Sequence, residues 1–326
     1  MRSCSRCARL QYHLLSSCRA WLCGTCTPHW AQRTIGAAWS SALGFSTGRA
    51  GRVALRHKHL GVWRERSWAE LADEVGRLAA ALATPDISSK LTLTASLADD
   101  WKAGRLDWRD PTPIELACGR PDKPELVPPK LVPQRSPTTS EGRARLLHAI
   151  VHIEFSAINL ALDHAARFRG LPEQYYADWI GVAAEEAYHF TILRERLNSL
   201  GYDYGDFPAH AGLWEMAMKT ADDPLARMAL VPRLLEARGL DATPPIQRRL
   251  EQVGDEASAR VLDIILRDEI GHVGLGDHWF RQLCNARNLE PESTYRALLR
   301  DFKAPRPIAP MNESARLAAG FSAAEV

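Results

Sequence analysis

Two short motifs of the same composition, each a glutamate followed three residues later by a histidine, are candidate metal-binding pairs. They are Glu186 with His189 and Glu269 with His272. In an α-helix, residues i and i+3 lie about 60° apart around the axis and about 4.5 Å apart along it, so each carboxylate and imidazole can reach one ion. The sequence therefore predicts two helical faces that each offer one oxygen and one nitrogen ligand.

Each motif is preceded by a further glutamate in an apolar, helix-like stretch. Glu154 lies 32 residues before Glu186, and Glu236 lies 33 residues before Glu269. One Glu from each of two helices and a Glu-x-x-His from each of two others is the arrangement with which a four-helix bundle holds two metal ions. We expect Glu154 and Glu236 to be terminal ligands, and the near-equal intervals indicate two helical hairpins related by a pseudo-two-fold axis.

A single Glu-x-x-His is usually a solvated pair on a helix surface, so the surroundings of the motifs decide their interpretation. Apolar residues such as Val182, Phe190, Ile265 and Val273 flank both copies. An ionised glutamate in such a helix is costly unless it is paired or coordinated. Two copies, each with a matching upstream glutamate, therefore favour a two-metal centre.

Three residues beside the motifs are candidates for supporting the ligands. Glu185 and Asp268 each directly precede a motif glutamate and could accept the second imidazole N–H of a ligand histidine, which would fix its tautomer. Tyr188 precedes His189 and is either a hydrogen-bonding or redox-active neighbour of the centre or a core residue. We expect no catalytic residue beyond the metal ligands.

The ligand types limit the metal and the chemistry. Carboxylates and imidazoles with open coordination positions suit iron or manganese better than a closed structural zinc site. We expect two iron ions, with manganese as the alternative, and O₂ as co-substrate in the oxidation of a small organic molecule with an external electron donor. An iron-binding protein of the ferroxidase type and a metal-free interaction module are the alternatives, and a homodimer is compatible with each.

The apolar periodicity predicts an all-α fold for most of the chain. Pro172 and the pair Asp223-Pro224 are typical helix starts, and Gly201 is a typical helix end. We expect Pro244 and Pro245 to open a short helix, and Asp255 to cap the last long one. The expected helices span about 141–169, 172–201, 223–239, 244–254, 255–288 and 292–303.

The chain before and after these helices differs in composition. Residues 108–140 contain eight prolines, which predicts an extended arm or linker. Residues 51–107 are expected to form a short helical region, residues 141–303 the bundle, and residues 304–326 a loose tail.

Residues 1–50 lack acidic side chains and are rich in Arg and Ser, as in a mitochondrial targeting peptide. Their spacing of Cys4, Cys7, Cys23 and Cys26 also matches a zinc ribbon. An unstructured leader and translation from a misassigned upstream start are further alternatives. We expect a cytoplasmic location in a bacterium and allow a mitochondrial one in a eukaryote.

Charge and cysteine content narrow the function classes. Residues 1–64 contain ten Lys/Arg and no acid, so the rest carries 31 basic and 39 acidic residues, a net charge of −8. An acidic body does not suggest nucleic-acid binding. No run of eighteen apolar residues occurs, so no membrane span is expected. Only Cys118 and Cys284 follow residue 26, which fits a reducing compartment.

Other polar residues are weaker candidates. His148 and His152 share a helix face, but His152 lies about 200° from Glu154 around the axis, so we expect them to be surface or core histidines. Arg227 and Arg233 lie near Glu236 and could bind an anionic substrate, although surface salt bridges are the usual role. His210 and Trp214 could cover the centre as a lid.

Residues 101–299 resemble the DUF455 family of the ferritin-like superfamily. The resemblance rests on five stretches: HAIVHIEFSAINLALD (148–163), DWIGVAAEEAYHF (178–190), YGDFPAHAGLW (204–214), ARMALVPRLLEARGLDATP (226–244) and LRDEIGHVGLGDHWF (266–280). It implies a ferritin-like four-helix bundle with a di-iron or related centre at the six ligand positions, and it leaves the substrate open. Residues 51–84 weakly resemble the N-terminal edge of acyl-CoA synthetase-type adenylate-forming enzymes, without a catalytic motif.

Overall fold

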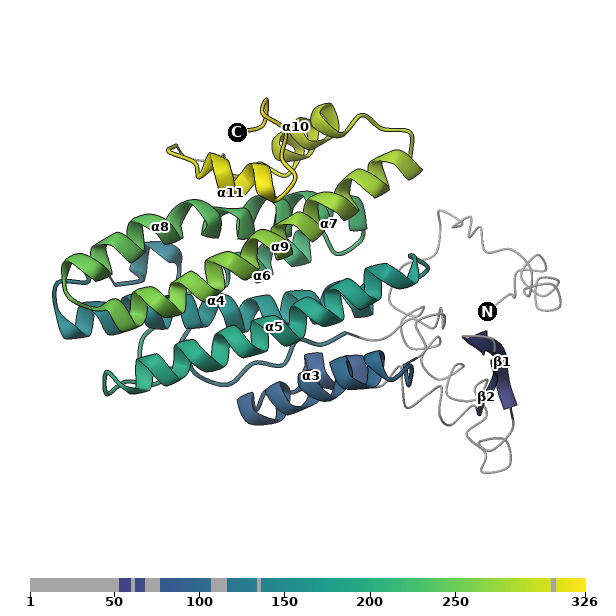
Figure 1. The fold of residues 1–326 in the computed structure, drawn as a ribbon, viewed down its shortest axis with the longest axis horizontal. Helices are drawn as coiled ribbons and strands as arrows, with labels where there is room; N and C mark the ends of the chain where they lie inside the picture. The colour runs from purple at the N-terminus through teal and green to yellow at the C-terminus, as the bar shows by residue number, and fades with distance from the viewer. Residues whose placement is uncertain (1–52, 60–61, 68–76, 107–115, 134–135, 306–308) are drawn as a thin grey trace, which may run out of the picture. The chain divides into compact units, whose positions relative to one another are not determined.

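A computed structural model shows a mostly helical protein (Figure 1). It describes residues 53–59, 62–67, 77–106, 116–133, 136–305 and 309–326. The chain divides into two compact units, residues 1–69 and 70–326. The predictions for residues 1–50 lie outside the described residues.

The first unit contains an antiparallel β-hairpin where a helical region was expected. β1 (Val53–His59) pairs with β2 (Val62–Ser67), with Lys58 opposite Trp63 and His59 opposite Val62. Only two residues separate the strands in the sequence, which is typical of a tight hairpin. The helical prediction for residues 51–107 is therefore wrong at its start, although residues 77–83 and α3 (Ile87–Lys102) are helical.

The second unit is built from long helices that pack along their lengths. α4 contacts α5, α8 contacts α9, and α5 contacts α9, so that the two helical pairs are joined along α5 and α9 (Figure 1). Shorter helices pack against these four: α6 contacts α4, α7 and α10 contact α9, and α11 contacts α8 and α9. The helices are α4 (Ser140–Arg167), α5 (Glu173–Asn198), α6 (Gly212–Lys219), α7 (Pro224–Leu230), α8 (Ala237–Gln252), α9 (Glu256–Ala286), α10 (Pro291–Asp301) and α11 (Glu313–Ala318).

The starts of the long helices follow the expected capping chemistry. The Thr139 hydroxyl accepts a hydrogen bond from the Gly142 N–H at the start of α4, and Asp223 and Asp255 cap α7 and α9 in the same way. The faces between the helices are apolar and form one core, which includes Leu147, Val151, Ile158, Ile180, Phe190, Leu193, Leu230, Leu262 and Phe280.

The stretch from α7 to α8 differs from the prediction. A π-helical turn, η2 (Val231–Glu236), joins the two helices, and α8 continues through Pro244 and Pro245. The third helix was expected to end near Gly239, and Pro244 and Pro245 to open a new one. Proline has no backbone N–H, so it cannot bond the carbonyl four residues earlier. For Pro244 that carbonyl belongs to Leu240, and the Asn312 side-chain amide donates to it instead at 3.1 Å. A partner from elsewhere in the chain thus keeps the helix intact.

The C-terminal segment is folded, so the expectation of a loose tail is wrong. α11 packs on α8 and α9 through Ala315, Ala319 and Phe321, all of which are buried. Arg316 donates two hydrogen bonds to the Asp241 carboxylate on α8, at 2.9 and 2.6 Å. The apolar contacts and the ion pair fasten the segment to the long helices.

The described part of the proline-rich arm is extended. Val127 donates its backbone N–H to the Ala209 carbonyl at 2.8 Å, and the Ala209 N–H donates to Glu125 at 2.9 Å. Its one short 3₁₀ turn is η1 (Pro129–Leu131). The arm therefore bonds to the segment between α5 and α6.

Among the described residues, α4 is long enough and apolar enough to cross a membrane, judged by length and composition alone. However, 72% of its most apolar 18-residue stretch is buried inside the protein. That degree of burial is also typical of the core helix of a folded domain.

Candidate metal centre

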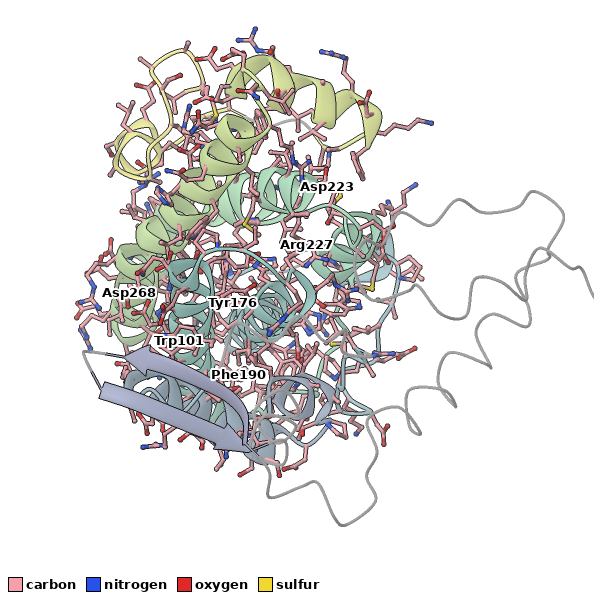
Figure 2. All side chains as sticks on the ribbon, turned by 90° about the vertical axis from the view of Figure 1, so that its right-hand side faces the viewer. Trp101, Tyr176, Phe190, Asp223, Arg227 and Asp268 are labelled. Atoms are coloured by element: carbon pink, nitrogen blue, oxygen red, sulfur yellow. The ribbon has the colours of Figure 1, made fainter. Side chains whose placement is uncertain are left out.

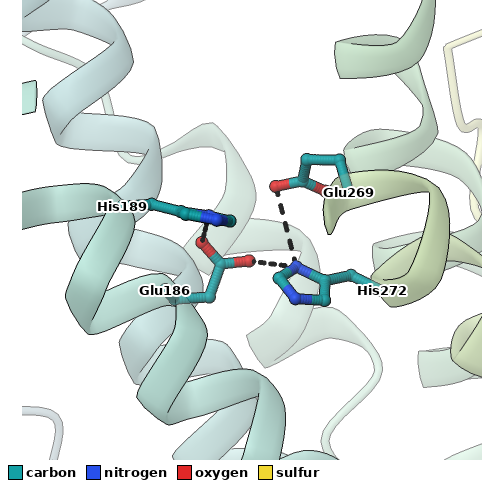
Figure 3. A group of neighbouring side chains, drawn as sticks. All are labelled: Glu186, His189, Glu269 and His272. Carbon is teal, nitrogen blue, oxygen red and sulfur yellow. Dashed lines mark hydrogen bonds and ion pairs between the residues drawn. The ribbon is translucent and has the colours of Figure 1, made fainter. Parts of the chain in front are cut away.

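The two Glu-x-x-His pairs meet between α5 and α9. Glu186, His189, Glu269 and His272 each offer one ligand atom, and these atoms lie within 4.8 Å of one another (Figure 3). Each pair projects from one helix face because its members are less than one turn apart. The structure therefore brings together two motifs that are more than eighty residues apart in sequence.

The Glu186 carboxylate lies between the two imidazoles. Its Oε1 is 2.9 Å from Nδ1 of His272, and its Oε2 is 3.6 Å from Nδ1 of His189. Glu269 Oε1 lies 3.9 Å from the same nitrogen of His272. One carboxylate that faces both histidines is in the position that a ligand bridging two ions requires.

The two upstream glutamates complete the group. Glu154 on α4 is buried, and its Oε2 lies 3.5 Å from Nδ1 of His189. Glu236 is the last residue of η2, and the carboxylates of Glu269 and Glu186 act on it electrostatically. The six predicted ligand residues therefore lie in one neighbourhood, with Glu154 on the His189 side and Glu236 near Glu269.

The outward nitrogens of both histidines bond to acids on the opposite helix. His189 Nε2 on α5 donates to Asp268 on α9 at 3.2 Å, and His272 Nε2 on α9 donates to Glu185 on α5 at 2.7 Å. Both bonds turn Nδ1 toward the interior, since the tautomer and ring orientation of a ligand histidine are set by the bond of its other nitrogen. The acids were predicted as partners of the histidines, but their crossing from one helix to the other was not.

Several interior atoms of the group have no hydrogen-bond partner. They are Glu154 Oε2, Glu186 Oε2, Glu269 Oε2 and His189 Nδ1. A buried polar atom without a partner costs about 1–3 kcal/mol. Four such atoms on neighbouring side chains are explained together by a cation that accepts their lone pairs.

The electrostatics of the group agree with this interpretation. Burial raises the pKa of Glu154 well above its usual value, and the neighbouring Glu186 raises it further. Burial also raises the pKa of Glu236 and of Glu269, where nearby carboxylates add to the effect. In the absence of a metal the group must therefore hold protons in place of a cation.

The histidines carry part of that positive charge. Burial lowers the pKa of His189, but its contacts with Glu154 and Glu186 outweigh this and raise the pKa to about 11. Burial opposes ionisation of His272 too, and the carboxylates around it, Glu186 first, still raise its pKa. The pKa of Glu186 is lowered because His272 and His189 offset its burial. Two imidazolium rings thus balance part of the carboxylate charge.

The donor set fits iron or manganese. It consists of carboxylate oxygens and imidazole nitrogens, with no thiolate, and hard or intermediate divalent ions prefer such ligands. The four glutamates, when ionised, would neutralise the charge of two divalent ions. Each histidine can serve only one ion. If two ions bind, the ligands would therefore form two half-sites, with Glu186 between them.

Tyr188 lies on the exposed side of α5. Its side chain is 51% exposed, although its ring centroid lies 6.1 Å from that of His189. Successive residues of a helix point about 100° apart, so the neighbour of an inward histidine faces outward. The alternative role in core packing is therefore wrong, and the role beside the ligands stays a prediction.

His148 and His152 are satisfied histidines, as predicted. His148 is buried and accepts the Gly205 N–H at 3.0 Å. His152 contacts the Tyr204 hydroxyl at 2.9 Å and the His210 carbonyl at 3.1 Å, and burial lowers its pKa to about 4. Both rings fasten the segment after α5, and the proposed lid role of His210 and Trp214 stays a prediction.

Arg227 and Arg233 are not surface residues, because both side chains are fully buried. Arg227 is labelled in Figure 2. Arg227 donates to Asp163 on α4 at 2.5 Å, and Arg233 donates to Asp277 on α9 at 2.7 Å. Internal carboxylates thus occupy both guanidinium groups. The prediction of an anionic substrate there is not supported, and the sequence analysis missed these partners.

Comparisons with known proteins identify relatives without an assigned function. The sequence model of a family described as "Protein of unknown function (DUF455)" matches residues 83–326. An uncharacterized protein of Haemophilus influenzae is 50% identical over 227 residues, which cover 68% of this chain and 79% of that protein. No solved structure matches the chain. The resemblance to this family is confirmed, and the match extends beyond residues 101–299 at both ends.

Proposed function

The chain belongs to the DUF455 family, and we propose that its long helices form a ferritin-like four-helix bundle that holds two metal ions. The pairing of α4 with α5 and of α8 with α9, joined along α5 and α9, supports the bundle. The order of the ligand residues along the chain supports its metal-binding class. One Glu comes from α4, one from η2, and one Glu-x-x-His pair from each of α5 and α9.

The observation that carries the proposal is the convergence of unpartnered donors. Glu186 and Glu269 each have an interior oxygen without a hydrogen bond, and so does Glu154. His189 has an unpartnered inward nitrogen. A purely structural cluster would be expected to satisfy these atoms internally, since buried polar groups are nearly always hydrogen-bonded.

We propose an O₂-dependent oxidoreductase of the monooxygenase or hydroxylase type. Two bound iron ions, or manganese in their place, would supply the redox chemistry, with O₂ as co-substrate and an external electron donor. The chain's own residues hold the ions, orient the ligand histidines through Asp268 and Glu185, and keep water from the interior with rings such as Phe155 and Phe190, whose centroids lie 5.7 Å apart. The organic substrate is unknown.

Iron handling without an organic substrate is the second candidate, and the position of Glu185 favours it. The side chain is 60% exposed and yet bonds His272 at 2.7 Å. An exposed carboxylate that bonds a buried ligand histidine can make the first contact with a cation that enters from solvent. On this alternative the protein oxidises Fe(II) and passes the iron on.

The proposal is tested by loading the full-length protein with Fe(II) without oxygen, measuring iron per chain, and following O₂ consumption and the optical spectrum after air is admitted. We expect two irons per chain and consumption of O₂. The variants Glu186→Ala and Glu269→Ala should lose iron, and the exposed Glu195→Ala on α5 should not. A wild-type protein that retains no iron or manganese would contradict the proposal.

The two candidates are separated by the fate of the iron. Release of Fe(III) with steady turnover of added Fe(II) supports iron handling. Iron that stays bound while an added reductant and O₂ are consumed supports the oxidoreductase.

A further inference from the structure

Arg233 lies at the centre of a buried charged cluster that joins three parts of the chain. It belongs to η2, and its Nε donates to Asp277 on α9 at 2.7 Å. Its Nη2 donates to Glu325, which follows α11. Arg281 on α9 also binds both acids, at 2.7 Å from Asp277 and 2.9 Å from Glu325. Two guanidinium groups and two carboxylates balance one another, as a buried charge requires.

Aromatic rings enclose the same guanidinium group. Its central carbon lies 4.1 Å from the ring centroid of Tyr295 on α10, 4.7 Å from that of Phe321 and 5.2 Å from that of Phe280. The remaining nitrogen, Nη1, has no hydrogen-bond partner, which suits a cation held against aromatic faces. Arg233 therefore has one defined position, set by side chains of α9, α10 and the C-terminal segment.

Close packing of η2 against α9 adds to this restraint. A Cβ atom on Gly276 would lie 2.5 Å from Cβ of Pro232, so only glycine permits this approach. On the other side of the cluster, Gly320 has a φ of +96°, and a Cβ there would lie 3.0 Å from Asp277 Oδ2. Both glycines let the backbone come close to the Arg233 cluster.

The restraint acts on a backbone geometry that does not form readily by itself. π-helical turns are rare, are usually single turns inside α-helices, and are frequent at functional sites. Arg227 anchors the α7 end of this stretch to Asp163 on α4, and Arg233 anchors the turn itself to α9. Glu236 follows Arg233 by three residues and ends the turn. The direction of its carboxylate therefore depends on the turn being held.

We propose that Glu325, acting through Arg233, is a positioning residue for Glu236, so that the C-terminal segment forms part of the half-site opposite Glu154. This inference rests on the proposed two-metal function. Glu325 does not touch the ligand cluster in the described contacts, and its effect would pass through η2. The half-site of Glu154 and His189 has no such dependence, because Glu154 lies within a regular helix.

The test compares Glu325→Ala with Glu292→Ala in the full-length protein. Glu292 accepts a hydrogen bond from Ser322 at 3.2 Å, so it holds the same segment without touching Arg233. Stepwise Fe(II) titration without oxygen gives the dissociation constants of the first and second ion. We expect Glu325→Ala to weaken the second ion about tenfold or more and to leave the first within about twofold. Glu292→Ala should leave both unchanged.

Hydrogen exchange of the metal-free proteins supplies an independent readout. The backbone amides of η2 should exchange faster in Glu325→Ala than in the wild type, with no change in Glu292→Ala. The conservative Glu325→Gln keeps an acceptor for Arg233 and should restore slow exchange. If the wild type binds no metal, the proposed function fails, and the exchange experiment still tests the positioning role. Unchanged exchange in Glu325→Ala, or equal weakening of both ions, would overturn the inference.

Discussion

The two halves of the candidate centre have the same ligand pattern but different supports. In the α4–α5 half, Glu154 lies in the middle of a regular helix and is 2% exposed. In the other half, Glu236 ends a π-helical turn, is partly exposed, and is followed by a helix with two internal prolines. Nearly equal spacing in sequence therefore does not imply equal structure. Apolar packing holds Glu154, whereas the charged cluster around Arg233 holds the turn that Glu236 ends.

The largest effect is expected from Glu186→Ala, which removes the carboxylate shared by the two halves. Because Glu186 faces both His189 and His272, its loss should weaken both ions by about a hundredfold or more, beyond the tenfold to hundredfold range typical of residues that only support a ligand. Metal content after desalting measures this. Retention of one tightly bound ion would show that Glu186 belongs to one half only.

Removal of one terminal ligand should separate the halves. Glu154→Ala and Glu236→Ala are each expected to lose one ion per chain and keep the other, because each glutamate lies on its own side of the group. Isothermal titration without oxygen, with Glu195→Ala as the control, gives the stoichiometry. Loss of both ions from either variant would mean that the halves cannot be filled separately.

Metal affinity should rise with pH. The pKa of His189 is raised to about 11, so this histidine is protonated at neutral pH in the metal-free protein, and burial raises the pKa of Glu154 and of Glu236 in the same direction. Each bound ion must displace protons, so affinity should change about tenfold per pH unit for each proton released. Titrations between pH 6 and 8 test this. An affinity independent of pH would contradict the proton-filled metal-free state.

A smaller effect is expected from the acids behind the histidines. Asp268→Asn and Glu185→Gln should each weaken binding about tenfold, because each removes the charged partner of one imidazole. Asp268→Asn should affect the half with His189, and Glu185→Gln the half with His272. Glu195→Gln on the exposed face of α5 is the matched control and should change nothing. The dissociation constants of both ions in each variant show which acid supports which half of the centre.

The sequence predicted the parts of this protein that follow local periodicity. The long helices and the caps at Asp223 and Asp255 follow from residues that are close in sequence. The meeting of the two Glu-x-x-His motifs was predicted from their repeated pattern. The DUF455 relationship followed from the same stretches. Periodic patterns are reliable because each residue of a helix has a fixed direction.

The features that the sequence did not predict depend on distant partners. Pro244 was predicted to open a helix. The Asn312 amide that bonds the Leu240 carbonyl in place of a proline N–H lies 68 residues after Pro244, so the local sequence did not reveal it. The burial of Arg233 depends on Asp277 and Glu325, which belong to other elements. Pro232 in the middle of a helical stretch was the one local sign of an irregular turn, and it did not indicate what would stabilise that turn.

The central claim is that two metal ions lie between α5 and α9 in unequal half-sites. Anomalous diffraction from crystals of metal-loaded protein, at the iron and manganese absorption edges, tests it most directly. We expect two peaks, one bound by Glu154 and His189 and the other by Glu236 and His272, with Glu186 between them. A single peak with a closed ligand shell, or no peak near these residues, would contradict it.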